Sequence, residues 1–261
     1  MSVVRQMFRP HRLIMFAIGI ALVIWCGLSM RWDWLSTYWN NGLLVQGLRN
    51  TLWILGVSWL LGLFLALWLG LAQAAGPWYL ATPAKGFCSV IRGTPLLLQL
   101  WMLYYGLGSL FPTYPWLRSS ALWPYLREAW PYALLSLTLS AAGYGGEVMR
   151  GAFRGVDRGQ LEAARAFGMP RLTILRRIWL PLAVRRVLPT LGGEAVLLLK
   201  STPLVATVTV IDIYAVSSQV RQDTYLTYEP LLLLALAYMA MAGIIAFLFS
   251  RLERRIPARL A

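Results

Sequence analysis

The chain has 261 residues, of which 59% are hydrophobic and only 13% charged, and its formal net charge is +14. About a quarter of the residues are charged in an average soluble domain, so this composition excludes an ordinary soluble protein. The cationic residues fall between and beside apolar blocks rather than along one soluble surface, which indicates membrane topology and excludes nucleic acid as their partner.

Six apolar segments near the length of a bilayer span predict membrane-crossing helices. In chain order they are residues 13–30, 50–73, 88–110, 131–153, 187–211 and 230–249. The first follows a basic tail and could instead be a cleaved signal peptide, because Gly27-Leu28-Ser29 offers small residues for cleavage. We favour a retained span, since the run is long for a signal peptide and more spans follow it.

The segments between the spans differ in character. Residues 31–49 are rich in Trp, Tyr and Asn and are expected at the membrane interface. Residues 74–87 read as a cytoplasmic turn or elbow, and 212–229 as a polar external segment. Within the second span, Gly56, Gly62 and Gly70 predict close helix contacts, and Pro95 is expected to be tolerated inside the third span.

The positive charges assign both termini to the cytoplasm. Three arginines in the N-terminal tail, Lys85, Arg92, nine arginines from Arg150 to Arg186 and four in the C-terminal tail make 18 of the 24 cationic residues. Lysine and arginine accumulate in cytoplasmic segments of membrane proteins. Six spans with both ends inside therefore place the loop after the fourth span in the cytoplasm.

That loop, around residues 162–181, predicts a basic helix-turn-helix. Glu162-Ala163-Ala164 favours a helix that ends at Gly168, in a left-handed conformation that glycine adopts cheaply. Pro170 fits the start of a second helix, which we expect to stop at Pro181. An ordinary solvated loop does not need this much helical amphipathicity, so we interpret the segment as a docking element for a soluble partner.

Charged residues within the spans are functional candidates because they are costly in a bilayer. Glu147 has a structural alternative, since Arg150 lies three residues on and can pair with it. Glu194 and Lys200 lie about 240° apart on a helix and are expected to have different partners. Glu194 could face a substrate cavity or brace a neighbouring helix. Cys26 and Cys88 are expected as free thiols, and His11 forms no metal site.

Motifs for nucleotide binding and hydrolysis are absent from the sequence. It contains no G-x-x-x-x-G-K-[ST], H-E-x-x-H or G-x-S-x-G. The chain is therefore not expected to bind ATP or a metal itself. A membrane-embedded enzyme using Glu147 or Glu194, and a plain membrane anchor, remain the alternative classes; neither requires a docking loop.

The loop spacing resembles the EAA loop of bacterial binding-protein-dependent ABC import permeases, with Gly168 six residues after Glu162 and Ile178-Trp179-Leu180-Pro181 after that. Further matches resemble the histidine/glutamine/arginine/glutamate uptake subfamily. They are Gly47 to Leu52, Arg92-Gly93-Thr94-Pro95-Leu96, Gln99-Leu100, Tyr104-Tyr105-Gly106, Tyr144, Glu147, Arg150-Gly151-Ala152, Gly159-Gln160 and Lys200-Ser201-Thr202-Pro203-Leu204. The extra N-terminal span and Gly192-Gly193, where a Ser-Asn pair is frequent, depart from the pattern.

The resemblance implies an all-α polytopic fold, the transmembrane domain of a type I ABC importer. Its expected domains are 1–49 (basic tail, extra span and interfacial segment), 50–250 (transmembrane domain) and 251–261 (basic tail). The implied partners are two cytoplasmic ATPase subunits that hold ATP and Mg, a second permease subunit, identical or paralogous, an external solute-binding protein and membrane lipid. The implied solute is a polar amino acid, or alternatively an opine or another amino-acid derivative.

The resemblance also assigns residues to two roles. Residues implied for ATPase coupling are Glu162, Ala163, Ala164, Gly168, Ile178 and Pro181. Residues expected along the substrate pathway are Tyr144, Glu147, Glu194, Lys200 and Thr202. The implied location is the bacterial inner membrane.

Overall fold

The computed structural model describes residues 24, 27 and 29–254, and these are helical with turns and without strands. The expected first span, 13–30, lies almost wholly outside the described residues, as do His11, Cys26 and most of the C-terminal tail. Cys88 is a buried free thiol.

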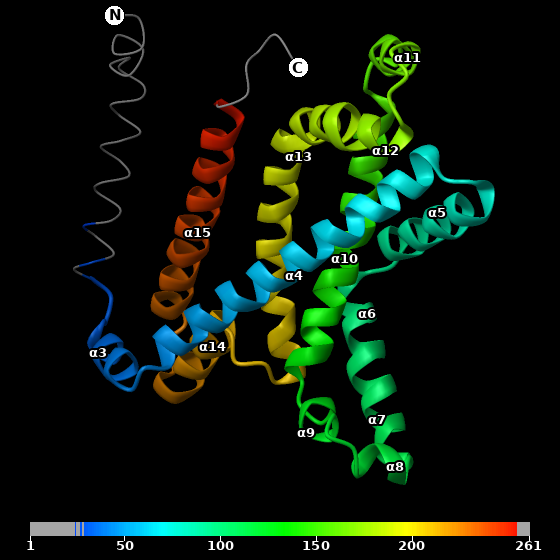
Figure 1. Ribbon diagram of the computed structural model, residues 1–261. Coiled ribbons are helices and arrows are strands. Elements are labelled where there is room, and N and C mark those ends of the chain that lie inside the picture. Colours follow the sequence, from blue (N-terminus) through cyan, green and yellow to red (C-terminus); the bar gives the residue numbers. More distant parts are fainter. Residues whose placement is uncertain (1–23, 25–26, 28, 255–261) are drawn as a thin grey trace, which may run out of the picture.

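The described chain is a sequence of long helices joined by short ones (Figure 1). The first half comprises α3 (Asp33–Asn40), α4 (Leu43–Ala75), α5 (Trp78–Gly93), α6 (Leu96–Trp101), a π-helix η1 (Met102–Leu107), α7 (Gly108–Leu110), a 3-10 helix η2 (Phe111–Thr113), α8 (Pro115–Arg118) and α9 (Trp123–Leu126). The second half comprises α10 (Trp130–Arg154), α11 (Arg158–Ala166), α12 (Arg171–Ile174), a π-helix η3 (Leu175–Trp179), α13 (Leu180–Ser201), a 3-10 helix η4 (Thr202–Val208), α14 (Ile213–Thr224) and α15 (Tyr228–Arg254).

The long helices give the bundle two distinct ends (Figure 1). We name the end where α4 and α10 finish and α13 begins the basic end, because the arginine-rich segment 150–186 lies there. The other end, the distal end, holds α3, α9 and α14.

Among the described residues, α4 and α15 are long and apolar enough to cross a membrane alone. Two bent pairs, Trp78–Gly93 with Leu96–Thr113 and Arg171–Val208 with Ile213–Thr224, bring the number to four. Helix α10 is less apolar, but its 25 residues extend about 37 Å, more than the roughly 30 Å of a hydrocarbon core. The total of six spans stays a prediction.

Helices α4 and α10 form the centre of the fold and pack through glycines. A Cβ placed on Gly62 would lie 2.4 Å from the Cβ of Ala141, and one on Gly70 would lie 2.4 Å from the Cβ of Met149. Small residues let helix backbones approach this closely. The expectation is confirmed for Gly62 and Gly70 and wrong for Gly56, which has nothing within 4 Å of a Cβ.

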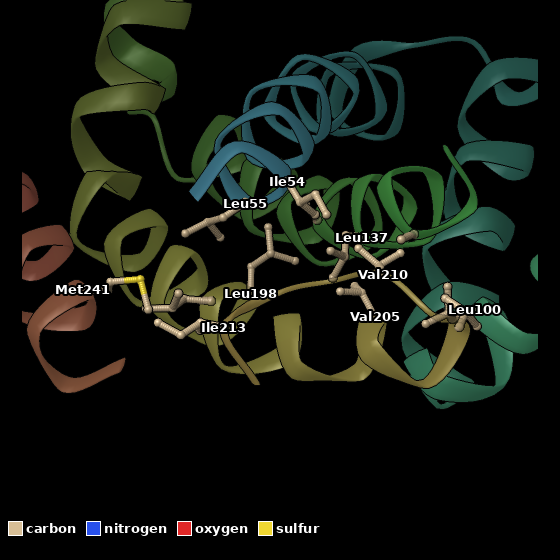
Figure 2. Close-up of a cluster of buried hydrophobic side chains, with 13 residues drawn as sticks. Ile54, Leu55, Leu100, Leu137, Leu198, Val205, Val210, Ile213 and Met241 are labelled. Carbon is tan, nitrogen blue, oxygen red and sulfur yellow. The ribbon is translucent and has the colours of Figure 1, made fainter. Parts of the chain in front are cut away.

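A cluster of buried apolar side chains joins α4 and α10 to the later helices (Figure 2). Ile54 and Leu55 from α4 meet Leu137 from α10, Leu198 from α13 and Met241 from α15. Burying such side chains contributes about 1.5–3 kcal/mol each when the alternative is water. In a bilayer, where lipid is equally apolar, the close fit itself is the larger gain. The cluster fixes α13 against the central pair.

The predicted bounds of the third span, 88–110, and of the segment before it, 74–87, differ from the structure. Residues 78–93 form helix α5, which contains Pro83, and the chain then bends by 104° into α6. Pro95 has no N–H to continue a helix, and the residue before a proline avoids helical angles. The Gln99 side-chain amide donates to the carbonyls of Ile91 (2.9 Å) and Thr94 (3.0 Å). The break therefore keeps its backbone groups satisfied.

Pro181 does not end the second loop helix, as the sequence had suggested. The helix begins at Arg171, passes through the π-helical turn η3 and continues as α13 to Ser201. Pro181 comes just after the π-turn η3, which accommodates a residue without an N–H inside the continuous helix. In Figure 1 the helix first lies across the basic end and then turns along the bundle, a bend that π-turns and prolines produce.

At the distal end, residues 212–229 are not simply a polar surface segment. They contain α14, whose Val216 and Val220 are fully buried. Asp212 is also fully buried and caps this helix by accepting a bond from the Ala215 N–H (2.8 Å). The Tyr38 hydroxyl donates to Asp223, which joins α3 to α14. The segment expected at the membrane interface thus packs, through α3, against α14.

Candidate functional site

The loop at the basic end is a helix with a defined stop. Asp157 caps α11 by accepting from the Gly159 N–H (2.9 Å). At its other end Gly168 has a φ of +72°, as predicted. The Gly168 N–H donates to the Arg165 carbonyl and the Met169 N–H to the Ala164 carbonyl. This pair of bonds is a Schellman motif, which requires a left-handed residue at Gly168.

The outer face of the loop is not covered by any other part of the described chain. Glu162, Ala163 and Gly168 are exposed, whereas Ala164 is buried against the bundle. Phe167, next to Gly168, is 87% exposed and Leu172 is 60% exposed. Large apolar side chains presented together at a surface are typical of a protein interface. Ile178 and Pro181 are half-buried and lie behind this face, in the helix that returns to the bundle.

The loop is fixed to α10 by contacts that hold its second helix. The Trp179 indole N–H donates to the Phe153 carbonyl (2.8 Å), and the two rings meet edge to face with centroids 5.3 Å apart. Arg186 donates to the Gly155 carbonyl. These contacts tie the second loop helix to the end of α10, and the same helix continues directly into α13.

A cavity of about 310 Å³ lies midway along the bundle. We name it the midspan cavity; its polar lining residues are Thr94, Gln99, Ser140, Tyr144, Glu194, Lys200 and Ser201, with Trp59 and aliphatic side chains completing the wall. Glu194 and Lys200 thus line one cavity, although their helix positions predicted different partners. Among the described residues neither side chain takes part in an ion pair.

Nearer the basic end lies a second cavity of about 390 Å³. We name it the basic-end cavity; it is lined by Gln73, Ala81, Thr82, Lys85, Glu147, Arg150 and Arg154. Glu147 accepts from Arg150 at 2.8 and 3.0 Å, which confirms the structural pairing expected from their spacing. Arg92 also approaches Glu147, at 3.7 Å.

The structure separates the predicted pathway residues into three groups. Tyr144, Glu194 and Lys200 line the midspan cavity, while Glu147 lines the basic-end cavity. Thr202 lines neither of them: it is fully buried, and its hydroxyl bonds to the Leu199 carbonyl and the Tyr238 hydroxyl. Thr202 therefore holds η4 against α15.

Two residues of the site were not assigned a role from the sequence. The Arg92 guanidinium lies 5.7 Å from the centre of the Tyr144 ring and also reaches Glu147, so it stands between the two cavities. Its charge within a predicted span was the available signal. Gln99 lines the midspan cavity and stabilises the break at Pro95. Within the described residues, no group of His, Cys, Asp and Glu could hold a metal ion.

Comparison with known proteins agrees with this architecture. Residues 60–257 match the family described as the binding-protein-dependent transport system inner membrane component. The octopine transport system permease protein OccM of Rhizobium meliloti is 40% identical over 210 residues, covering 80% of this chain and 84% of that protein. The histidine/lysine/arginine/ornithine transport system permease protein HisM of Escherichia coli is 33% identical over 222 residues, 85% of this chain and 92% of that protein.

Among solved structures, the chain is similar to an amino acid ABC transporter crystallised with histidines. The TM-score is 0.72 at 29% identity, and the match covers 87% of this chain and 100% of that one. These relatives are transport proteins, as the resemblance of the loop implied. The chain therefore belongs to the family of binding-protein-dependent transport system inner membrane components and is a permease subunit of an ABC importer, not an enzyme.

Proposed function

We propose that this permease imports an amino acid or an amino-acid derivative through the midspan cavity. The observation that carries the proposal is that Glu194 and Lys200, two side chains of opposite charge, line one cavity. Unpaired charges are costly in a membrane and are typical of solute pathways. An amino acid brings a carboxylate for the Lys200 ammonium and an ammonium group for the Glu194 carboxylate. The cavity volume falls at the lower end of the roughly 300–1,000 Å³ found for small-molecule sites.

The names of the relatives support this class of solute, and they include both amino acids and an opine. HisM is named for histidine, lysine, arginine and ornithine, and OccM is named for octopine. A single amino acid is our main proposal, and an opine is the alternative. The two differ in size and in the number of carboxylates, so uptake measurements distinguish them directly.

We place the basic end in the cytoplasm, together with both termini. The support is the excess of arginine from Arg150 to Arg186, which follows the positive-inside rule. The exposed face around Glu162, Ala163, Phe167 and Gly168 then faces the cytoplasm, where it is our candidate contact for an ATPase subunit, with Ala164, Ile178 and Pro181 supporting it from behind. Two ATPase subunits would hold ATP and Mg, and a second permease and a solute-binding protein would complete the importer.

The experiment measures solute uptake in a strain whose chromosomal copy of the gene is deleted and which expresses the chain from a plasmid. Labelled L-arginine, L-histidine, L-glutamine and octopine are compared, and Glu194→Gln is measured beside Glu128→Gln, a matched change in the surface turn before α10. We expect one of these solutes to be taken up and Glu194→Gln to reduce uptake at least tenfold at normal abundance. Equal uptake in the two variants would contradict the role of the midspan cavity.

A further inference from the structure

The basic-end cavity has the charge pattern of a site for a solute that carries both charges. Its wall comes from the end of α4, the start of α5 and the end of α10. It presents three cationic side chains, Lys85, Arg150 and Arg154, and one carboxylate, Glu147. The lining is therefore net positive, with one negative position inside it.

The cations of this cavity are not equally committed to protein partners. Arg150 is held by two bonds to Glu147, and Arg154 donates one bond, to the Gln73 carbonyl oxygen (3.2 Å). Lys85 is exposed and takes part in no ion pair among the described residues. Lys85 and the remaining N–H groups of Arg154 are therefore available to a carboxylate.

Gln73 adds an independent signal for a ligand at the same place. Its side chain is only 6% exposed, and its amide nitrogen lies 3.4 Å from the Cys88 sulfur. Its amide oxygen is buried without a hydrogen-bond partner, although the residue lines the cavity. Buried acceptors are nearly always satisfied in proteins, and a ligand N–H entering this cavity would satisfy this one.

We propose that the basic-end cavity binds the α-amino acid part of the transported solute after it leaves the midspan cavity, an inference that rests on the proposed function. The solute carboxylate lies between Lys85 and Arg154, and its ammonium group donates to the Gln73 amide oxygen and faces Glu147. A simple anion would leave Gln73 unsatisfied and would place negative charge beside Glu147. A ligand with both charges matches the whole lining.

The position of the cavity makes it a release-side site. Arg92 contacts Glu147 of this cavity and Tyr144 of the midspan cavity, so one side chain links the walls of the two cavities. Solute that accumulates on the basic side would keep the release-side site occupied. The transporter would then be inhibited by its own product from the cytoplasm.

The test uses the complete complex of permeases and ATPases in vesicles, oriented with the ATPases outward. Binding protein and labelled solute are enclosed, ATP is added outside, and unlabelled L-arginine is titrated outside. We expect L-arginine to slow ATP-driven release, and Lys85→Gln to raise its inhibition constant about tenfold. Lys85→Arg should restore inhibition because it keeps the cation. Agmatine, which lacks the carboxylate, and acetate, which lacks the ammonium, should inhibit at least tenfold more weakly.

Arg154→Gln provides a second variant from another helix, with membrane abundance as the folding control. Inhibition that is the same in wild type, Lys85→Gln and Arg154→Gln would overturn the proposal. The proposal would also be overturned if Lys85→Gln left inhibition by L-arginine unchanged and altered only how transport depends on the phosphatidylglycerol content of the vesicles. That result would assign the cavity to a lipid headgroup. Failure of the proposed function looks different: no amino acid or opine would be transported by the wild type at all.

Discussion

Replacing Gly70 by alanine tests the close packing of α4 and α10 at its tightest point. The added Cβ would lie 2.4 Å from the Met149 Cβ and 2.9 Å from the Arg150 backbone nitrogen. Carbon atoms make favourable contacts at about 3.5–4.0 Å, so the helices must separate locally by more than about 1 Å. A Cβ cannot rotate away, and the strain falls at the upper end of the overpacking range, about 3 kcal/mol.

Alanine also favours a helix over glycine by about 1 kcal/mol, so the net loss of stability is about 2 kcal/mol. A change of this size lowers Tm by about 4–8 °C in a chain of this length. The assay is thermal unfolding of the purified permease in detergent. Gly56→Ala, in the same helix but with no atom within 4 Å of its Cβ, is the matched control. Equal Tm values for the two variants would refute the packing argument.

Three further predictions concern the loop, the ion pairs and the distal end. Gly168→Asp would place a side chain at a left-handed position, which costs about 1–2 kcal/mol. We expect normal abundance, at least tenfold lower uptake and loss of solute-stimulated ATP hydrolysis. Normal uptake would refute the docking assignment. Glu147→Gln leaves Arg150 without its carboxylate and should lower stability by about 1–2 kcal/mol, part of which the double variant Glu147→Gln/Arg150→Gln recovers in thermal unfolding; no recovery would mean that the pair is not coupled. Burial raises the pKa of Tyr38 from 10 to about 12, so the folded state holds this proton more tightly and stability should fall as pH rises from 10 through 12; a Tyr38→Phe variant with the same pH dependence would contradict this.

Local signals in the sequence predicted the features that depend on a few neighbouring residues. The stop at Gly168 follows from the left-handed conformation that ends a helix, and the pairing of Glu147 with Arg150 follows from their spacing. The long apolar runs likewise predicted helices over 50–73 and 230–249, within α4 and α15.

Features that depend on tertiary contacts were missed or misplaced. The bend at Pro95 is stabilised by Gln99, which bonds to the carbonyls freed there, and the helix passes Pro181 because a π-turn precedes it. The burial of Thr202 and the position of Arg92 between two cavities depend on α15 and α10, which lie far away in the sequence. No period or spacing within a single segment contains that information.

The unbroken helix from Arg171 to Ser201 gives the permease the geometry of a crank. One arm lies across the basic end and carries the exposed loop, and the other runs along the bundle to Glu194 and Lys200. Because no break in the helix separates the two arms, a force on the loop would tilt the long arm. From Leu180 to Lys200 that arm measures about 30 Å, so a tilt of about 10° would carry Lys200 sideways by about 5 Å. Glu194 and Lys200 both lie on this arm, so the tilt would carry the two charges together past the facing wall of the midspan cavity.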